Sequence, residues 1–123
     1  FFDNDLYERY VERARRAGIY IPIVPGILPV HNFGQVARFS ASCGAHVPSW
    51  LADRFAGLEN DPQTHSLVAA AVAAEQVLDL VERGVSEFHF YTMNRADLAF
   101  AICHLIGVRA DENRAPMTAQ AAA

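Results

Sequence analysis

The longest regular pattern of hydrophobic positions lies between Asp61 and Gly84, where apolar residues return every three or four positions. Asp61 followed by Pro62 is a typical helix start, and Gly84 is a typical stop. The pattern therefore predicts a long helix, the surest in the chain. One apolar face of this helix is formed by Leu67, Ala71, Ala74, Leu78 and Val81.

Shorter helices are predicted on both sides of the long one. Each begins at a capping or helix-starting residue and stops at a glycine, the residue that most easily adopts the left-handed conformation at a helix end. The first start is a capping box, formed by Asp5 with Glu8 three residues later. These helices run from Asp5 to Gly18, from Asn32 to Gly44, from Val47 to Gly57 and from Asn94 to Gly107.

Two stretches have the composition of β-strands. Residues 19–24 are β-branched and apolar at nearly every position, which is typical of a strand buried on both faces of a parallel sheet, although Pro22 counts against a strand. Residues 87–92, EFHFYT, are rich in aromatic side chains. Phe1 and Phe2 have the character of the end of a further strand.

The order of these elements, strand end, helix, strand, helices, strand and helix, predicts an α/β fold whose parallel strands are joined by helical crossovers. The strands are too few to close a sheet, because a barrel of this kind needs eight. We therefore expect the C-terminal part of a larger α/β unit, with apolar surface left without a partner. Residues 110–123 show no pattern and are predicted to be a disordered tail.

Composition narrows the class of protein. The chain has 123 residues, of which 52% are hydrophobic and 20% charged, as expected of a globular domain. Its net charge of −4 argues against a nucleic-acid partner. Cys43 and Cys103 form no Cys-x-x-Cys pair, which favours reduced thiols in the cytoplasm. No membrane segment is expected, because Glu75, Gln76 and Asp79 interrupt the most apolar stretch.

Ligands of parallel α/β proteins bind where the strands end, so two segments are candidates for a site, residues 25–39 and 91–97. Each has an Asn at a helix start, followed three residues later by Gln35 or Asp97. Capping boxes show the same spacing, so these side chains either cap the helices or meet a ligand. Gln35 and Phe39 share one helix face and together could bind a flat heterocycle, while the alternative for Phe39 is core packing.

Arg95 is a cation at the start of a predicted helix, where the helix dipole disfavours it by about 0.3–1 kcal/mol. An anionic ligand would reverse this cost, and so would an ion pair with Asp97 or another carboxylate. The five histidines show no metal-ligand spacing, so no metal site is expected. No phosphate-binding glycine loop and no serine nucleophile elbow is present in the sequence, and no catalytic residue is assigned.

Three stretches, VPGILPVHNFGQVARF, VPSWLADRFAGLEN and EFHFYTMNRADLAFAICHLIGVR, are similar to the bacterial type of methylenetetrahydrofolate reductase. The resemblance covers residues 1–109. It implies the C-terminal portion of a (β/α)8 TIM barrel that is incomplete in this chain. It also implies FAD as cofactor, NAD(P)H as hydride donor, 5,10-methylenetetrahydrofolate as substrate and a homo-oligomeric full-length protein.

The resemblance further implies that Gln35, Phe39 and Arg95 bind the folate, and that the apolar turn at residues 25–30 forms a wall of the cleft. The family's flavin-binding and proton-donating residues correspond to segments before Phe1. We therefore expect the chain to be inactive by itself. The alternative is a noncatalytic binding or assembly module that another chain completes.

Overall fold

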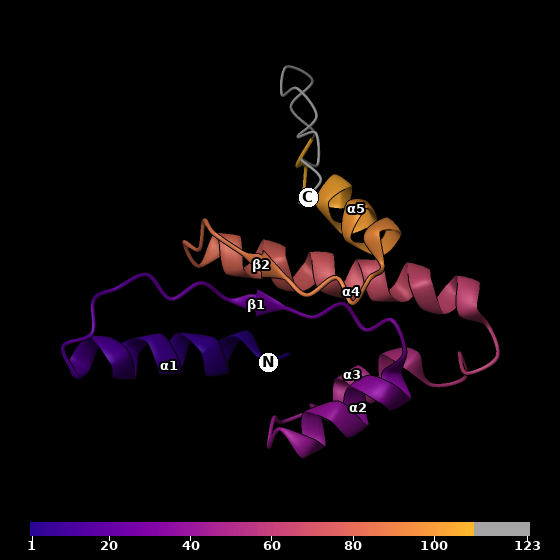
Figure 1. Ribbon diagram of the computed structural model, residues 1–123, viewed down its shortest axis with the longest axis horizontal. Helices are drawn as coiled ribbons and strands as arrows, with labels where there is room; N and C mark the ends of the chain where they lie inside the picture. The colour runs from indigo at the N-terminus through magenta and orange to yellow at the C-terminus, as the bar shows by residue number, and fades with distance from the viewer. Residues whose placement is uncertain (110–123) are drawn as a thin grey trace, which may run out of the picture.

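Helices account for most of the fold in residues 1–109, the part of the chain that this computed structural model describes (Figure 1). The predicted tail, residues 110–123, lies outside the described residues. The elements are α1 (Asn4–Arg16), β1 (Gly26–Ile27), α2 (Phe33–Ser42), α3 (Ser49–Phe55), α4 (Pro62–Glu82), β2 (His89–Phe90) and α5 (Ala96–Leu105).

Local capping signals fix most of the helix starts. Asn32 Oδ1 accepts the Gln35 backbone N–H at 3.0 Å and so caps α2, as predicted. Asp61 Oδ1 accepts the Thr64 backbone N–H at 3.0 Å and caps α4 in the same way. In α1 the cap is Asp3 rather than the predicted Asp5, because the Asp3 carboxylate accepts the Asp5 N–H at 2.9 Å.

The predicted start of α5 at Asn94 is wrong. Met93 and Asn94 both have left-handed backbones, with φ of 49° and 60°, whereas a capping residue needs an extended one. The chain instead turns through these two residues, and the turn is closed by the Arg95 N–H, which donates to the Thr92 carbonyl at 2.8 Å. Arg95 is therefore the residue that precedes α5, and its side chain makes no capping hydrogen bond.

The two strands pair in parallel, with Gly26 opposite His89 and Ile27 opposite Phe90. The pairing continues by one bond on each side, because the His89 N–H donates to the Pro25 carbonyl at 3.0 Å and the Tyr91 N–H donates to Ile27 at 2.9 Å. Helices α2, α3 and α4 carry the chain from β1 to β2 (Figure 1). The predicted α/β class with parallel strands is therefore present.

The first strand was predicted too early in the chain, at residues 19–24, whereas β1 comprises residues 26–27. Residues 19–24 are extended but belong to no strand, and Ile21 is 68% exposed. Pro22 has no N–H to donate, and the Arg15 guanidinium donates to the carbonyls of Ile19 and Ile21 at 2.8 and 3.0 Å. A strand forms only where a neighbour supplies partners, and in the described residues β2 lies beside residues 26–27 alone.

Helix α4 is the centre of the packing and contacts α1, α3 and α5. Most of the apolar face found from spacing is not the face that packs, since Leu67, Leu78 and Val81 are 66%, 47% and 49% exposed. Ala74 is the one residue of the predicted face that is buried. By length and composition alone α4 could cross a membrane, a property that the core helix of a globular domain shares. The residues that it buries are Ala69, Ala70, Val72, Ala73, Ala74, Val77 and Leu80.

A close contact joins the ends of the two strands. A Cβ atom placed on Gly26 would lie 2.6 Å from Tyr91 Cε2, so the Tyr91 ring occupies the space that any other side chain at position 26 would need. Gly26 belongs to the Pro-Gly-Ile motif and Tyr91 to the Phe-His-Phe-Tyr-Thr motif. The two most distinctive stretches of the sequence therefore touch in space.

Candidate functional site

A pocket of about 240 Å³ lies where the segments that follow β1 and β2 meet the start of α4. This is the end of the sheet where ligands of parallel α/β proteins bind. Two of the three predicted site residues, Gln35 and Arg95, line it. The full lining is His31, Asn32, Gln35, Pro62, His65, Ser66, Arg95, Asp97 and Leu98.

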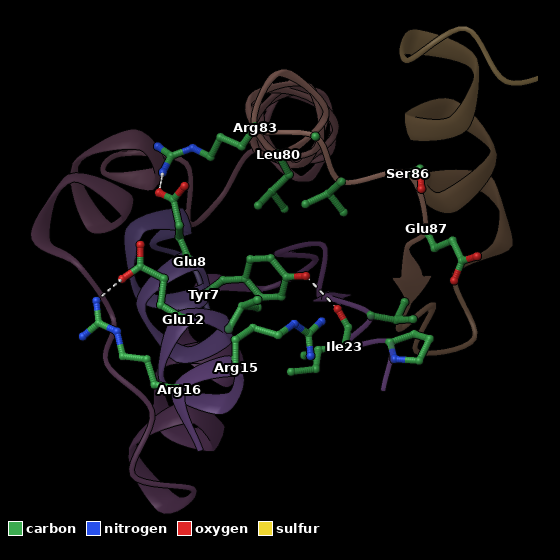
Figure 2. A pocket seen from close by; sticks show the side chains of 15 residues that line it. Tyr7, Glu8, Glu12, Arg15, Arg16, Ile23, Leu80, Arg83, Ser86 and Glu87 are labelled. Atoms are coloured by element: carbon green, nitrogen blue, oxygen red, sulfur yellow. Dashed lines mark hydrogen bonds and ion pairs between the residues drawn. The ribbon is translucent and has the colours of Figure 1, made fainter. Parts of the chain in front are cut away.

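A larger cavity, of about 820 Å³, lies between α1 and the end of α4, on the side from which the chain enters the strands (Figure 2). Several of its polar groups have partners within the protein. Arg83 donates to Asp5 at 2.7 Å and to Glu8 at 2.9 Å, and the Tyr7 hydroxyl donates to the Ile23 carbonyl at 2.7 Å. These contacts join α1 to α4 and to the segment before β1, so we assign this cavity a structural role.

Gln35 is not a reciprocal capping partner. Its backbone N–H is held by Asn32, but its exposed side chain makes its hydrogen bond elsewhere, with Oε1 3.3 Å from His31 Nε2. The capping interpretation therefore accounts for Asn32 and leaves the Gln35 amide available to a ligand.

Phe39 lies one helical turn after Gln35, and its side chain is 60% exposed. The core-packing alternative for Phe39 is therefore wrong for the described residues. Phe39 is not among the residues that line the pocket. Its ring instead lies on the same helix face as Gln35, beyond the residues that line the pocket.

Arg95 lines the pocket from the residue before α5. In residues 1–109 no carboxylate lies within ion-pair distance of its guanidinium, and Asp97 lines the pocket without pairing to it. The ion-pair alternative is therefore not found in this part of the chain. The Arg95 charge remains open to an anionic ligand.

The apolar turn after β1 differs from what the resemblance implies. Pro25, Ile27, Pro29 and Val30 are buried, and Ile27 and Val30 belong to the core cluster. These residues belong to β1 and to the residues on either side of it, and they support the site from the side of the core. They do not form an open wall of the pocket.

Two histidines of the site were missed by the sequence analysis, which tested histidines only for metal spacing. His31 lines the pocket from the loop before α2, and His65 lines it from the second turn of α4. The Phe33 backbone N–H donates to His65 Nε2 at 3.4 Å, and the His65 ring lies 4.6 Å from that of Phe55. Within residues 1–109, no group of three or more metal-ligating side chains is present.

Acid should weaken the anchoring of α2 through His65. Burial, aided by the nearby charge of His31, lowers the pKa of His65 below its ordinary value of 6.5. As pH falls below about 6.5, the unfolded chain takes up a proton that the folded protein excludes, and stability falls. We expect the thermal midpoint to fall between about pH 7.5 and 5.5, and to fall less in His65→Gln, which cannot titrate.

The control for this measurement is His46→Gln, a change at an exposed histidine outside the pocket, which should leave the pH dependence as it is. An equal fall in His65→Gln and the unmodified protein would contradict the role of His65.

The sequence is similar to known proteins over most of its length. The sequence profile of the family described as methylenetetrahydrofolate reductase matches residues 1–107. A 5,10-methylenetetrahydrofolate reductase of Pectobacterium carotovorum is 48% identical over 114 residues, which are 93% of this chain and 38% of the relative. The protein of the same name from Salmonella typhimurium is 48% identical over 109 residues, 89% of this chain and 37% of the relative.

A more distant relative, methylenetetrahydrofolate reductase 1 of Schizosaccharomyces pombe, is 31% identical over 117 residues, 95% of this chain and 19% of the relative. The chain thus spans less than two fifths of the length of the bacterial relatives, and the family profile covers almost all of the described residues. The resemblance drawn from the sequence motifs is confirmed: the chain belongs to the methylenetetrahydrofolate reductase family.

Proposed function

We propose that this chain forms the folate-binding side of a reductase that converts 5,10-methylenetetrahydrofolate to 5-methyltetrahydrofolate, with FAD as cofactor and NAD(P)H as hydride donor. The observation that supports this most is the meeting of Gln35 and Arg95 in one pocket at the ends of two parallel strands. The names of the curated relatives support the substrate and its reduction, and the family resemblance implies the cofactor and the hydride donor.

Each of the three side chains matches a different part of a folate. The Gln35 amide both donates and accepts hydrogen bonds, as an edge of the pterin ring does. The Phe39 ring offers a face on which a flat aromatic group can stack. Arg95 offers a guanidinium that binds a carboxylate well, and the glutamate portion of a folate carries carboxylates. These residues bind and orient the substrate, and we assign none of them a step in the chemistry.

The flavin does not fit the described residues. The pocket of about 240 Å³ is too small for FAD. In the cavity of about 820 Å³, Arg83 pairs with Glu8 and Arg16 pairs with Glu12, so neither of these guanidinium groups is free to bind a pyrophosphate. No step through the flavin is derived from this chain. We infer that the flavin-binding residues lie in the part of the reductase that the chain does not span.

We infer that this chain is the C-terminal part of a (β/α)8 barrel that further strands complete. Exposed apolar residues of the segment before β1, including Ile19, Ile21 and Val24, support this, because a neighbouring strand would cover them. We extend the proposal to a cytoplasmic, homo-oligomeric full-length enzyme. Cys43 and Cys103 are free thiols, as a reducing compartment allows.

A chimera tests the proposed function. Residues 1–109 of this chain replace the matching segment of the Salmonella typhimurium relative, and FAD content and folate reduction are measured. We expect the chimera to bind FAD and reduce the folate, whereas the isolated chain does neither. A folded, flavin-loaded chimera without folate reduction would contradict the proposal, and so would flavin-dependent turnover by the isolated chain.

A second candidate, a noncatalytic assembly module, is favoured by the exposed apolar residues of α4, such as Leu67 and Leu78. Light scattering on the isolated chain separates the two. A defined oligomer supports the module, whereas aggregation or unfolding supports an interrupted barrel.

A further inference from the structure

The start of α2 is held between two imidazoles that come from different parts of the chain. His31 approaches from the preceding loop, with Nε2 3.3 Å from Gln35 Oε1. His65 approaches from α4 and accepts the Phe33 backbone N–H at 3.4 Å. Both rings line the same pocket as Gln35. The residue expected to meet the folate is thus held by two histidines to which the resemblance assigns no role.

The position of the proton on the His31 ring determines whether His31 binds the oxygen or the nitrogen of the Gln35 side-chain amide. Oε1 of Gln35 is an acceptor, so the contact is a hydrogen bond only when the proton of the His31 ring is on Nε2. Within residues 1–109, His31 Nδ1 is buried without a partner, so no second contact competes in setting the tautomer. The Gln35 contact favours the tautomer that donates from Nε2. The carbonyl end of the amide is then engaged, and its NH2 group remains free.

The backbone beneath this side chain is also fixed. Asn32 Oδ1 accepts the Gln35 N–H at 3.0 Å. The ring of Phe33 stacks on Phe55 at a centroid distance of 5.8 Å, and Phe55 in turn contacts His65. Helix α2 therefore cannot rotate about its axis without breaking contacts to α3 and α4. With the backbone held in this way, the direction of the Gln35 amide depends on the side-chain torsions of Gln35.

We propose that His31 is a positioning residue for folate binding: its Nε2–H holds the carbonyl oxygen of Gln35, so that the Gln35 NH2 group is presented to an acceptor atom of the pterin ring. This inference rests on the proposed function. His31 itself does not need to touch the substrate.

The test uses the full-length enzyme and two substitutions of matched size. His31→Met removes the donor and keeps an apolar side chain of similar length. We expect it to raise the KM for 5,10-methylenetetrahydrofolate about fivefold, with kcat within about twofold, because a Gln35 amide that His31 no longer holds contributes roughly 1 kcal/mol less to binding of both the substrate and the transition state. His31→Gln places an NH2 group near the position of Nε2 and should restore the KM to within about twofold.

The same His31→Met change is then made in a Gln35→Ala background. If His31 acts through Gln35, it has no further effect there, to within about 1.5-fold. An equal loss in both backgrounds would overturn the inference, because His31 would then act on the fold. If His31→Met does not fold, His31→Ala removes the same donor with a smaller side chain and is judged by the same outcomes.

The failures of the two proposals are distinguishable. If Gln35→Ala weakens folate use but His31→Met does not, this inference is wrong and the proposed function stands. If neither Gln35→Ala nor Arg95→Ala changes the folate KM of a folded, flavin-loaded enzyme, the proposed folate site itself is wrong, and this inference fails with it.

Discussion

Replacing Leu80 by alanine should destabilise the full-length protein by about 2–5 kcal/mol. Leu80 is 0% exposed and lies on the face of α4 that packs, together with the fully buried Ile27 and Ile102. The substitution removes buried methyl groups and leaves a cavity that the close-packed neighbours fill only in part. Urea unfolding followed by circular dichroism measures the loss.

Leu67→Ala is the matched control, because it makes the same chemical change on the same helix at a side chain that is 66% exposed. It should alter the free energy of unfolding by no more than about 0.5 kcal/mol. A loss at Leu67 as large as that at Leu80 would contradict the assignment of the packed face and would mean that the full-length protein covers this side of α4.

Replacing Phe39 by alanine should lower kcat/KM for 5,10-methylenetetrahydrofolate by about tenfold to a hundredfold, while FAD content stays unchanged. The substituted ring is 60% exposed, so its removal costs the fold little. Loss of an aromatic surface that becomes covered by the substrate costs about 1.5–3 kcal/mol of binding, which corresponds to that range. Gln35→Ala should act in the same direction, by about three- to tenfold.

Steady-state kinetics with the folate varied, together with flavin absorbance of the purified variants, measures this prediction. Phe100→Ala is the control, since Phe100 is similarly exposed, at 67%, and lies on α5 outside the pocket. Its kcat/KM should stay within about twofold of the parent enzyme. Equal losses of flavin and folate binding by Phe39→Ala, in a protein that remains folded, would contradict the folate assignment.

The sequence predicted the features that depend on neighbouring residues in the chain. Asn32 and Asp61 cap the helices that they were predicted to start, because a capping side chain contacts only the first turn of its own helix. The extent of the strands was not predictable in this way. Whether residues 19–24 pair depends on a neighbouring strand, and composition alone does not reveal whether that neighbour is present.

The packed face of α4 was also beyond local reasoning. The helix is apolar on nearly all sides, so spacing identified a hydrophobic stripe at Leu67 and Leu78 without showing that the alanine-rich side is the one that packs. The alanines lack bulk, and they allow neighbouring elements to approach closely.

For the candidate site, the rule that ligands bind at strand ends brought Gln35 and Arg95 together correctly. Family resemblance, rather than spacing, supplied their roles, and these roles stay predictions. The contribution of His65 could not be predicted, because it arises from the way α4 returns to the start of α2. His31 lies only four residues before Gln35, so its contact with that side chain had a local signal that metal-ligand spacing did not reveal.

The contact between Gly26 and Tyr91 has a consequence for the width of the pocket. Each strand leads into one of the two segments that carry Gln35 and Arg95, so the closeness of the strands limits how far apart those segments stand. Because position 26 has no side chain, the Tyr91 ring can lie over the backbone of β1. Any other residue there would displace this ring, which stands at the start of the segment that carries Arg95.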